Sequence, residues 1–129
     1  MGTSSPKISV AYAQKCAHES LTGFPPRVTE SYLAFAAQGD AANLDAAVLG
    51  VLNFYLATKP NVSIEQLPGT TRLIEDLGCD SLTMMDTVFM VETLFDIKLA
   101  DADLTNIATL DDLRTLLRKH VHAEAKSTA

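Results

Sequence analysis

Apolar residues recur every three or four positions along most of this chain, which is the spacing of one face of an α-helix. The clearest run reaches from Ser81 to Phe95, and Asp80 before it is a residue type that commonly caps a helix start. The apolar residues of this run are Leu82, Met84, Met85, Val88, Phe89, Val91, Leu94 and Phe95. They cover more of the helix than one core-facing stripe requires, so we expect it either to be deeply buried or to dock partners.

The same spacing predicts an earlier helix over residues 43–58, which ends before Pro60 because the residue preceding a proline disfavours the helical conformation. Residues 59–80 then form a long connection. A loop of this length inside a compact domain is usually functional. We expect a short turn over residues 73–77, and Gly78 allows the chain to turn sharply into the next helix.

Two further helices are predicted towards the C-terminus. The first is short and covers residues 101–107. The second covers residues 110–121, and Thr109 with Asp112 three positions later is a capping-box pattern at its start. Residues 123–129 are interpreted as a flexible tail.

Residues 1–41 form an N-terminal segment with weaker patterns. One helix is predicted over residues 8–21 and another over residues 29–38, and the Gly-Phe-Pro-Pro stretch at 23–26 separates them. The whole chain is therefore predicted to be all-α.

Particular residues set the details of this segment. Thr29 is the expected cap of its second helix, and Tyr32 and Phe35 are its expected packing residues. Residues 40–43 are interpreted as a turn. The segment could pack on the rest of the protein, form a dimer contact or recognise one partner enzyme.

The charge of the chain is unevenly distributed. The net charge is −6, while residues 1–41 contain three basic and three acidic residues and are neutral. The acidic remainder argues against nucleic acid as the main partner and favours partners with basic surfaces. Cys16 and Cys79 form no disulfide framework, and no signal peptide or membrane span is evident, so we expect a cytoplasmic protein.

Catalytic and metal-binding patterns are weak. Cys16 and His18, like His120 and His122, are two positions apart, which points them to different sides of a helix. We find no phosphate-binding glycine loop, no Ser-His-Asp arrangement and no pair of catalytic carboxylates. The expectation is that the chain is not an enzyme and holds no metal.

Several motifs lie at fixed spacings around Ser81. They are Asp-Leu-Gly-Cys-Asp-Ser-Leu at 76–82, the acid and aromatic residue Glu92 and Phe95, the acidic stretch Leu99–Asp103 and the run Ile107–Leu113. Through these motifs, residues 43–121 resemble the acyl carrier protein family. The agreement spans several predicted helices, so it is more specific than a short match.

The resemblance implies a four-helix bundle with helices over residues 43–58, 81–95, 102–107 and 110–121, within a carrier domain over residues 42–122. The two N-terminal helices are additional to it. The resemblance also implies that Ser81 carries a covalent 4′-phosphopantetheine arm, whose thiol holds acyl groups as thioesters. The implied partners are a phosphopantetheinyl transferase and acyl-loading, condensing and acyl-transfer enzymes.

The position of Ser81 suits this role, because the first turn of a helix favours an anion such as a phosphodiester. The positions that match those recognised by transferases and synthase partners are Asp80, Leu82, Asp86 and Glu92. Met85 and Phe89 are candidates for either a partner interface or the core. Met84, Val88, Val91 and Phe95 are expected to pack in the core, with contact to an acyl chain as a second use. The hypothesis is that the bundle can open a slot between helices, lined by these four residues and by Leu52, Ile107 and Leu113.

The chain departs from the family pattern on this helix. Thr83 stands where acyl carriers often have an acid, and Thr93 and Leu94 replace further acids near the helix end. Phe89 replaces a smaller or more flexible residue. These differences predict a specialised carrier with selective partners.

Two alternatives remain open from the sequence. A peptidyl carrier would hold an aminoacyl group, but such carriers more often have Gly-Gly-His-Ser or Gly-Gly-Asp-Ser before the leucine. A non-carrier helical module would keep the fold without the cargo, and the intact Asp80-Ser81-Leu82 argues against it. Fatty-acid, polyketide and specialised lipid pathways all remain open, and we expect a monomer.

Overall fold

The computed structural model describes residues 8–127, with side chains as far as residue 121. Its helices are α1 (Val10–Ser20), α2 (Pro26–Gln38), α3 (Ala41–Tyr55), the 3-10 turn η1 (Ile64–Gln66), α4 (Ser81–Phe95), α5 (Asp101–Thr105) and α6 (Leu110–Ser127). Within these residues the only β-type pairing is an isolated bridge between Arg72 and Thr109. The prediction of an all-α chain is confirmed.

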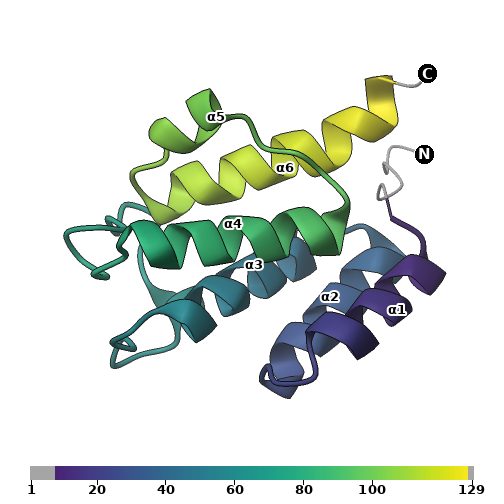
Figure 1. The fold of residues 1–129 in the computed structure, drawn as a ribbon, viewed down its shortest axis with the longest axis horizontal. Helices are drawn as coiled ribbons and strands as arrows, with labels where there is room; N and C mark the ends of the chain where they lie inside the picture. The colour runs from purple at the N-terminus through teal and green to yellow at the C-terminus, as the bar shows by residue number, and fades with distance from the viewer. Residues whose placement is uncertain (1–7, 128–129) are drawn as a thin grey trace.

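The helices form a bundle with an added hairpin (Figure 1). The helices α3, α4 and α6 lie beside one another, and the short α5 lies over α4 and α6. The α1–α2 hairpin stands to one side, against α3 and the C-terminal end of α4. This arrangement confirms the predicted acyl-carrier-like four-helix bundle with two extra N-terminal helices.

The start of α4 is built as the sequence predicts. The Asp80 carboxylate accepts a hydrogen bond from the Thr83 backbone N–H at 2.8 Å and caps the helix. Residues 73–77 form the expected turn, which the Gly78 and Cys79 backbone N–H groups close on the Ile74 and Leu73 carbonyls at 3.1 and 2.9 Å. Gly78 has φ of 69°, a left-handed conformation that glycine adopts without strain.

The prediction that Thr29 caps α2 is wrong, because the helix begins at Pro26. Proline suits the first helical position, because its φ is fixed near the helical value. It also lacks a backbone N–H, but an N–H at this position would make no hydrogen bond within the helix. At the other end, Gly39 has φ of 76° and its N–H donates to the Phe35 carbonyl at 2.7 Å. The helix therefore ends at Gln38, as the sequence predicts, and the left-handed conformation of Gly39 terminates it.

Residues 40–43 start α3 and do not form the predicted separate turn. The Asp40 carboxylate accepts hydrogen bonds from the Asn43 backbone N–H at 3.3 Å and from the Asn43 side-chain amide at 2.8 Å. Aspartate favours both turns and helix caps, and the following residues decide which of the two forms. The helix also ends at Tyr55, earlier than the predicted residue 58.

The two C-terminal helices differ from the prediction only in length. The helix α5 ends at Thr105, two residues before the predicted end. The helix α6 continues through Ser127, so its backbone is helical within the segment predicted as a tail. The last two residues of that segment, 128–129, lie outside the description.

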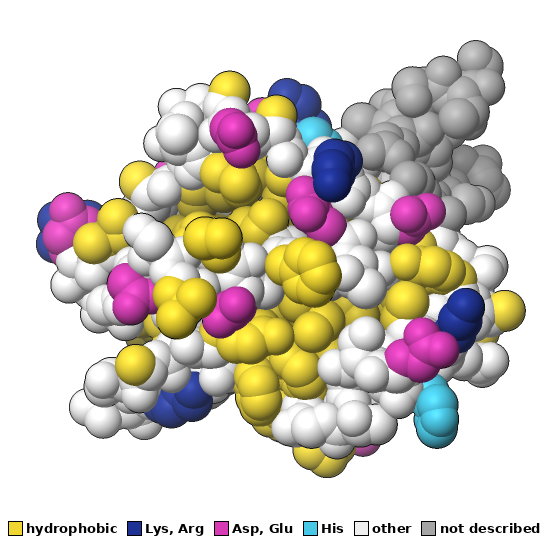
Figure 2. Space-filling model, in the orientation of Figure 1, with side chains coloured by type: hydrophobic (Ala, Val, Ile, Leu, Met, Phe, Trp, Pro, Cys, Tyr) yellow, Lys and Arg dark blue, Asp and Glu magenta, His cyan; other side chains and the backbone are white. Residues whose placement is uncertain are grey.

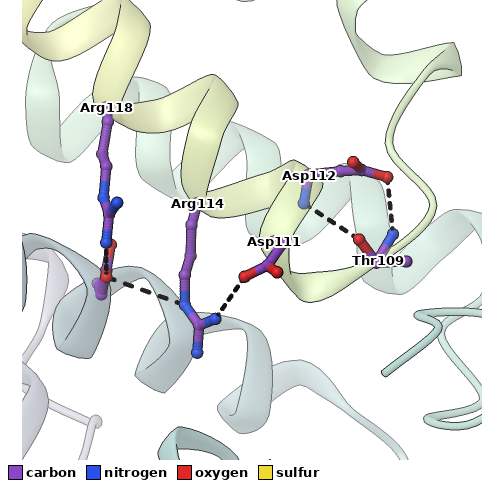
Figure 3. A network of polar contacts seen from close by, with 6 residues as sticks. Thr109, Asp111, Asp112, Arg114 and Arg118 are labelled. Carbon is purple, nitrogen blue, oxygen red and sulfur yellow. Dashed lines mark hydrogen bonds and ion pairs between the residues drawn. The ribbon is translucent and has the colours of Figure 1, made fainter. Parts of the chain in front are cut away.

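Polar contacts fix the start of α6 and bind it to α3 (Figure 3). The Asp112 N–H donates to the Thr109 hydroxyl at 3.2 Å, and the Asp112 carboxylate accepts the Thr109 N–H at 3.1 Å, which confirms the capping box. Further along α6, Arg118 forms a two-bond ion pair with Asp45 of α3. Arg114 lies 3.9 Å from the same carboxylate.

The α1–α2 hairpin packs on the bundle through its aromatic residues. Tyr32 and Phe35 are fully buried, and their ring centroids lie 5.4 and 5.7 Å from that of Phe95 in edge-to-face contacts. This confirms both as the packing residues of the N-terminal segment. The sequence left three roles open for this segment: packing on the rest of the protein, a dimer contact and recognition of a partner enzyme. The structure shows that the segment packs on the bundle.

The hairpin also closes the C-terminal end of α4. The last carbonyls of a helix have no partner within the helix. Here the Tyr12 hydroxyl donates to the Thr93 carbonyl at 2.6 Å, and the Tyr32 hydroxyl donates to the Leu94 carbonyl. Two tyrosines from the hairpin thus supply partners that this helix end lacks.

A close contact between a valine side chain of α2 and a glycine of α3 completes this packing. A Cβ atom built at Gly50 of α3 would lie 2.6 Å from a Val28 methyl group of α2. No real Cβ contact is this short, so the observed approach of the two helices depends on the absence of a side chain at Gly50.

Strong alkali is expected to weaken the hairpin contact. Burial, and to a smaller extent the neighbouring Cys16, raise the pKa of Tyr12 to about 12 from its ordinary value of 10.0. A pKa that is higher in the folded state stabilises the fold fully below the ordinary value, and this contribution is lost as pH rises from 10 to 12. Urea midpoints at about pH 8 and about pH 11 measure the loss.

The control for this prediction is Tyr12→Phe. Other groups also change charge in strong alkali, so the comparison is between slopes: the wild-type midpoint should fall more steeply with pH than that of the variant. Equal slopes would mean that ionisation of Tyr12 does not weaken the fold.

Candidate functional site

Ser81 is the first residue of α4 and is exposed to solvent. The amides and dipole of this helix start favour a negative charge at the serine. Its neighbour Asp80 has a lowered pKa, chiefly because its carboxylate accepts the Thr83 N–H. The serine hydroxyl is thus accessible, beside a carboxylate that is ionised at neutral pH.

The loop that delivers Ser81 is held in place by an ion pair and by buried residues. The Asp76 carboxylate accepts the Arg72 backbone N–H at 2.8 Å and pairs with the Arg72 guanidinium at 3.3 Å, and these bonds lower the pKa of Asp76. Leu73, Leu77 and Cys79 point into the core. Asp80 and Ser81, which follow these buried residues, are both exposed.

The predicted partner residues lie mostly on one exposed stripe of α4. Leu82, Met85 and Phe89 are 66%, 68% and 70% exposed. The sequence left open whether Met85 and Phe89 lie in a partner interface or in the core. The structure places both at the surface. Asp86 is half-buried and belongs to the same stripe, because residues three and four apart are neighbours on a helix.

Glu92 has a structural contact that its position in the sequence did not reveal. Its half-buried carboxylate accepts the Leu99 backbone N–H at 2.8 Å. This bond fixes the turn between α4 and α5. A role of Glu92 in partner binding is compatible with the bond but is additional to it.

An open groove of about 940 Å³ lies between α4, α5 and the loop before Ser81. Figure 2 shows hydrophobic side chains gathered over this region. The apolar residues of its lining are Leu73, Ile74, Met84, Met85, Val88, Phe89, Leu99, Leu104 and Ile107. Ser81 and Asp80 lie at one part of its wall.

The residues named for an acyl slot lie partly in this groove and partly in the core. Met84, Val88 and Ile107 line the groove, as predicted. The remaining predicted residues are core residues that are at most 1% exposed: Leu52, Val91, Phe95 and Leu113. The rings of Tyr32 and Phe35 pack against Phe95 in the core, whereas the open volume lies between α4, α5 and the loop.

The departures from the family pattern also have structural reasons. Thr83 is 6% exposed, so an ionised acid at this position would be buried at a high cost. Leu94 is fully buried, and the backbone carbonyls of Thr93 and Leu94 accept the hairpin tyrosines. The hairpin therefore covers the end of α4 where the family that the sequence resembles commonly has acids.

The other candidate residues of the sequence do not come together as a site in the part of the chain that the structure describes. It contains no cluster of three or more metal-ligating side chains and no helix that could span a membrane. Cys16 is buried and His18 is exposed, so they do not form a catalytic pair. His120 pairs with Asp103 at 3.2 Å, and the side chain of His122 lies outside the description.

Comparison with known proteins gives a consistent result. The family described as "Phosphopantetheine attachment site" matches residues 54–117. An acyl carrier protein of Thermotoga maritima is 38% identical over 64 residues, which are 50% of this chain and 79% of the relative. An acyl carrier protein of Onion yellows phytoplasma is 35% identical over 65 residues, covering 50% of this chain and 86% of the relative. No solved structure matches the chain significantly.

Proposed function

Because the chain belongs to the acyl carrier protein family, and so is a carrier with a covalent 4′-phosphopantetheine and not an enzyme, we propose that Ser81 is the attachment residue. The observation that carries this proposal is the exposed position of Ser81 at the capped start of α4, beside the groove. When attached, the arm supplies a thiol that holds acyl groups as thioesters.

The chain's own residues support this attachment in three ways. The turn at Gly78 and the ion pair of Arg72 with Asp76 hold the loop so that the serine is presented at the surface. Asp80 caps the helix and keeps its first amides oriented. The helix start favours the phosphodiester charge electrostatically, so no cationic side chain is required beside Ser81.

The groove beside Ser81 supports a role in sheltering the acyl cargo. Its volume of about 940 Å³ is at the upper end of the range for small-molecule pockets. Met84, Val88 and Ile107 give it an apolar wall. Methionine is flexible and polarizable, which allows the wall to adapt to different chains.

The surface of α4 supports a specialised pathway with selective partners. Leu82, Met85 and Phe89 are exposed, while the acids typical of this helix are replaced at Thr83 and Leu94. Enzymes that bind carriers mainly through basic patches would find fewer acids here. The proposed setting is the cytoplasm, with the carrier as a monomer that meets acyl-loading, condensing and acyl-transfer enzymes in turn.

Mass spectrometry tests the attachment directly. The purified chain is incubated with coenzyme A and a broad-specificity phosphopantetheinyl transferase, and its intact mass is measured. We expect a gain of one phosphopantetheine, located on Ser81 by fragmentation. No gain in mass, or a gain located on another serine, would overturn the proposal. The thioester on protein isolated from its native cell then identifies the pathway and separates an acyl from an aminoacyl cargo.

Counting reactive thiols provides an independent prediction. Both cysteines are buried, and burial together with the charge of Asp80 raises the pKa of the Cys79 thiol. We therefore expect no fast-reacting thiol in the native unloaded chain and one after loading, because the arm's thiol is exposed. A thiol-specific chromophore measures both rates.

Denaturation provides the control for this count. The unfolded unloaded chain should show two thiols, matching its two cysteines, and the unfolded loaded chain should show one more. Fast labelling of the native unloaded chain would show that Cys79 or Cys16 is accessible, contrary to the structure.

A further inference from the structure

An aromatic cluster lies beside the exposed stripe of α4. Phe24, in the turn between α1 and α2, stacks on Phe54 of α3 with ring centroids 4.0 Å apart. Tyr55 meets both rings edge-to-face, at 5.9 Å from Phe24 and 5.4 Å from Phe54. Phe54 remains 40% exposed, so the cluster is open to solvent on one side.

The cluster and the α4 stripe adjoin through Asp86. The helices α3, which carries Tyr55, and α4, which carries Asp86, pack against each other. The Asp86 carboxylate accordingly helps to raise the pKa of Tyr55, after the larger effect of burial. Figure 2 shows the same continuity, because hydrophobic side chains extend from α4 down to the junction of α3 with the hairpin. The two apolar areas therefore border one acidic residue.

Asp86 is also unpaired. Its carboxylate makes no ion pair and no hydrogen bond with any residue in the described range 8–121. A half-buried acid flanked by apolar side chains loses part of its hydration when a partner covers it. Such a group favours a partner that places a lysine or arginine against it.

We propose that the α1–α2 hairpin contributes, through Phe24 and its cluster with Phe54 and Tyr55, to the surface on which the enzyme that modifies Ser81 docks. The inference rests on the proposed function of Ser81. The occupant is a protein face with an apolar centre and a basic side chain opposite Asp86. The carrier would thus be recognised partly through a segment outside the four-helix bundle.

The size of the surface and its charge both support this occupant. A specific interface usually buries about 800 Å² on each partner, which the three side chains of the α4 stripe do not provide alone. A second copy of the chain would bring Asp86 and a net charge of −6 against the same charges, which opposes self-association. A basic partner gains from the same charges.

Steady-state kinetics of loading test the inference. The full chain is loaded from coenzyme A by a broad-specificity phosphopantetheinyl transferase, and KM and kcat are measured for Phe24→Ala, Phe89→Ala and Asp86→Lys. Each variant is expected to raise KM by roughly fivefold to tenfold and to leave kcat within about twofold, because truncating an interface anchor costs more than about 1 kcal/mol of binding. Val10→Ala, which removes another exposed apolar side chain, 42% exposed on α1, should match the wild type.

The outcomes separate this inference from the proposed function. If the wild type is not loaded at all, the assignment of Ser81 fails. If the wild type is loaded and Phe24→Ala has the wild-type KM, the hairpin does not contribute and the inference fails. The urea midpoint of Phe24→Ala, compared with that of the wild type, checks that this variant is folded. If its midpoint is clearly lower, KM and kcat are measured for Phe24→Leu instead. A dimer of the wild type that Phe24→Ala dissociates would identify a second copy as the occupant and also overturn the inference.

Discussion

Replacing Ser81 with alanine is expected to abolish attachment of 4′-phosphopantetheine completely, under conditions that load the wild-type chain. The hydroxyl is the only group of this side chain that can accept the arm. The fold should be unaffected, because Ser81 is exposed, the cap is provided by Asp80, and alanine is the best helix former. Intact mass after incubation with the transferase measures loading, and a urea midpoint close to that of the wild type confirms the fold.

Ser63→Ala is the matched control for this variant. Ser63 also precedes a helical turn, and its hydroxyl accepts the Glu65 N–H at 3.4 Å. It lies outside the groove beside Ser81, so this variant should load like the wild type. A mass gain on the Ser81→Ala chain would show that another residue is the attachment point and would refute the assignment.

Replacing Phe35 with alanine should produce the largest loss of stability among the substitutions considered. Phe35 is fully buried between the hairpin and Phe95. Truncating a buried phenylalanine usually costs about 3–5 kcal/mol, from lost burial and from the cavity left behind. Small proteins have only about 5–15 kcal/mol of unfolding free energy in total, so a large part would be lost. Urea unfolding followed by circular dichroism measures the change.

Phe54→Ala provides the same substitution at a partly exposed position. Phe54 is 40% exposed and lies at the end of α3, so its truncation should cost clearly less than that of Phe35. If the two variants lose similar stability, or if Phe35→Ala unfolds in two separate transitions, the hairpin is not part of one cooperative core with the bundle.

The features that the sequence predicted correctly depend on local chemistry. The extent of α4, its Asp80 cap and the left-handed turn at Gly78 follow from residues within a few positions of one another. The exposed stripe of Leu82, Met85 and Phe89 could be predicted only as one of two alternatives. The count of apolar residues showed an excess on this helix but not which part of it other elements would cover.

The features that the sequence did not predict depend on contacts between distant segments. The groove does not include Leu52, Val91, Phe95 and Leu113, which are buried in the core, and two hairpin rings pack against Phe95 there. Tyr12 was not singled out, since its contact with the Thr93 carbonyl spans 81 positions. The start of α3 at Asp40 was ambiguous, because aspartate suits turns and caps equally well. Pro26 is a local signal for the start of α2, because proline is favoured at the first helical position.

The close approach at Gly50 has a consequence for the transfer of this hairpin between proteins. A carrier with any side chain at that position would clash with Val28, and one with an acid at the position of Leu94 would bury a charge under the added helices. A chimera that fuses residues 1–40 to a minimal carrier should therefore fail to dock the hairpin unless both positions are changed together.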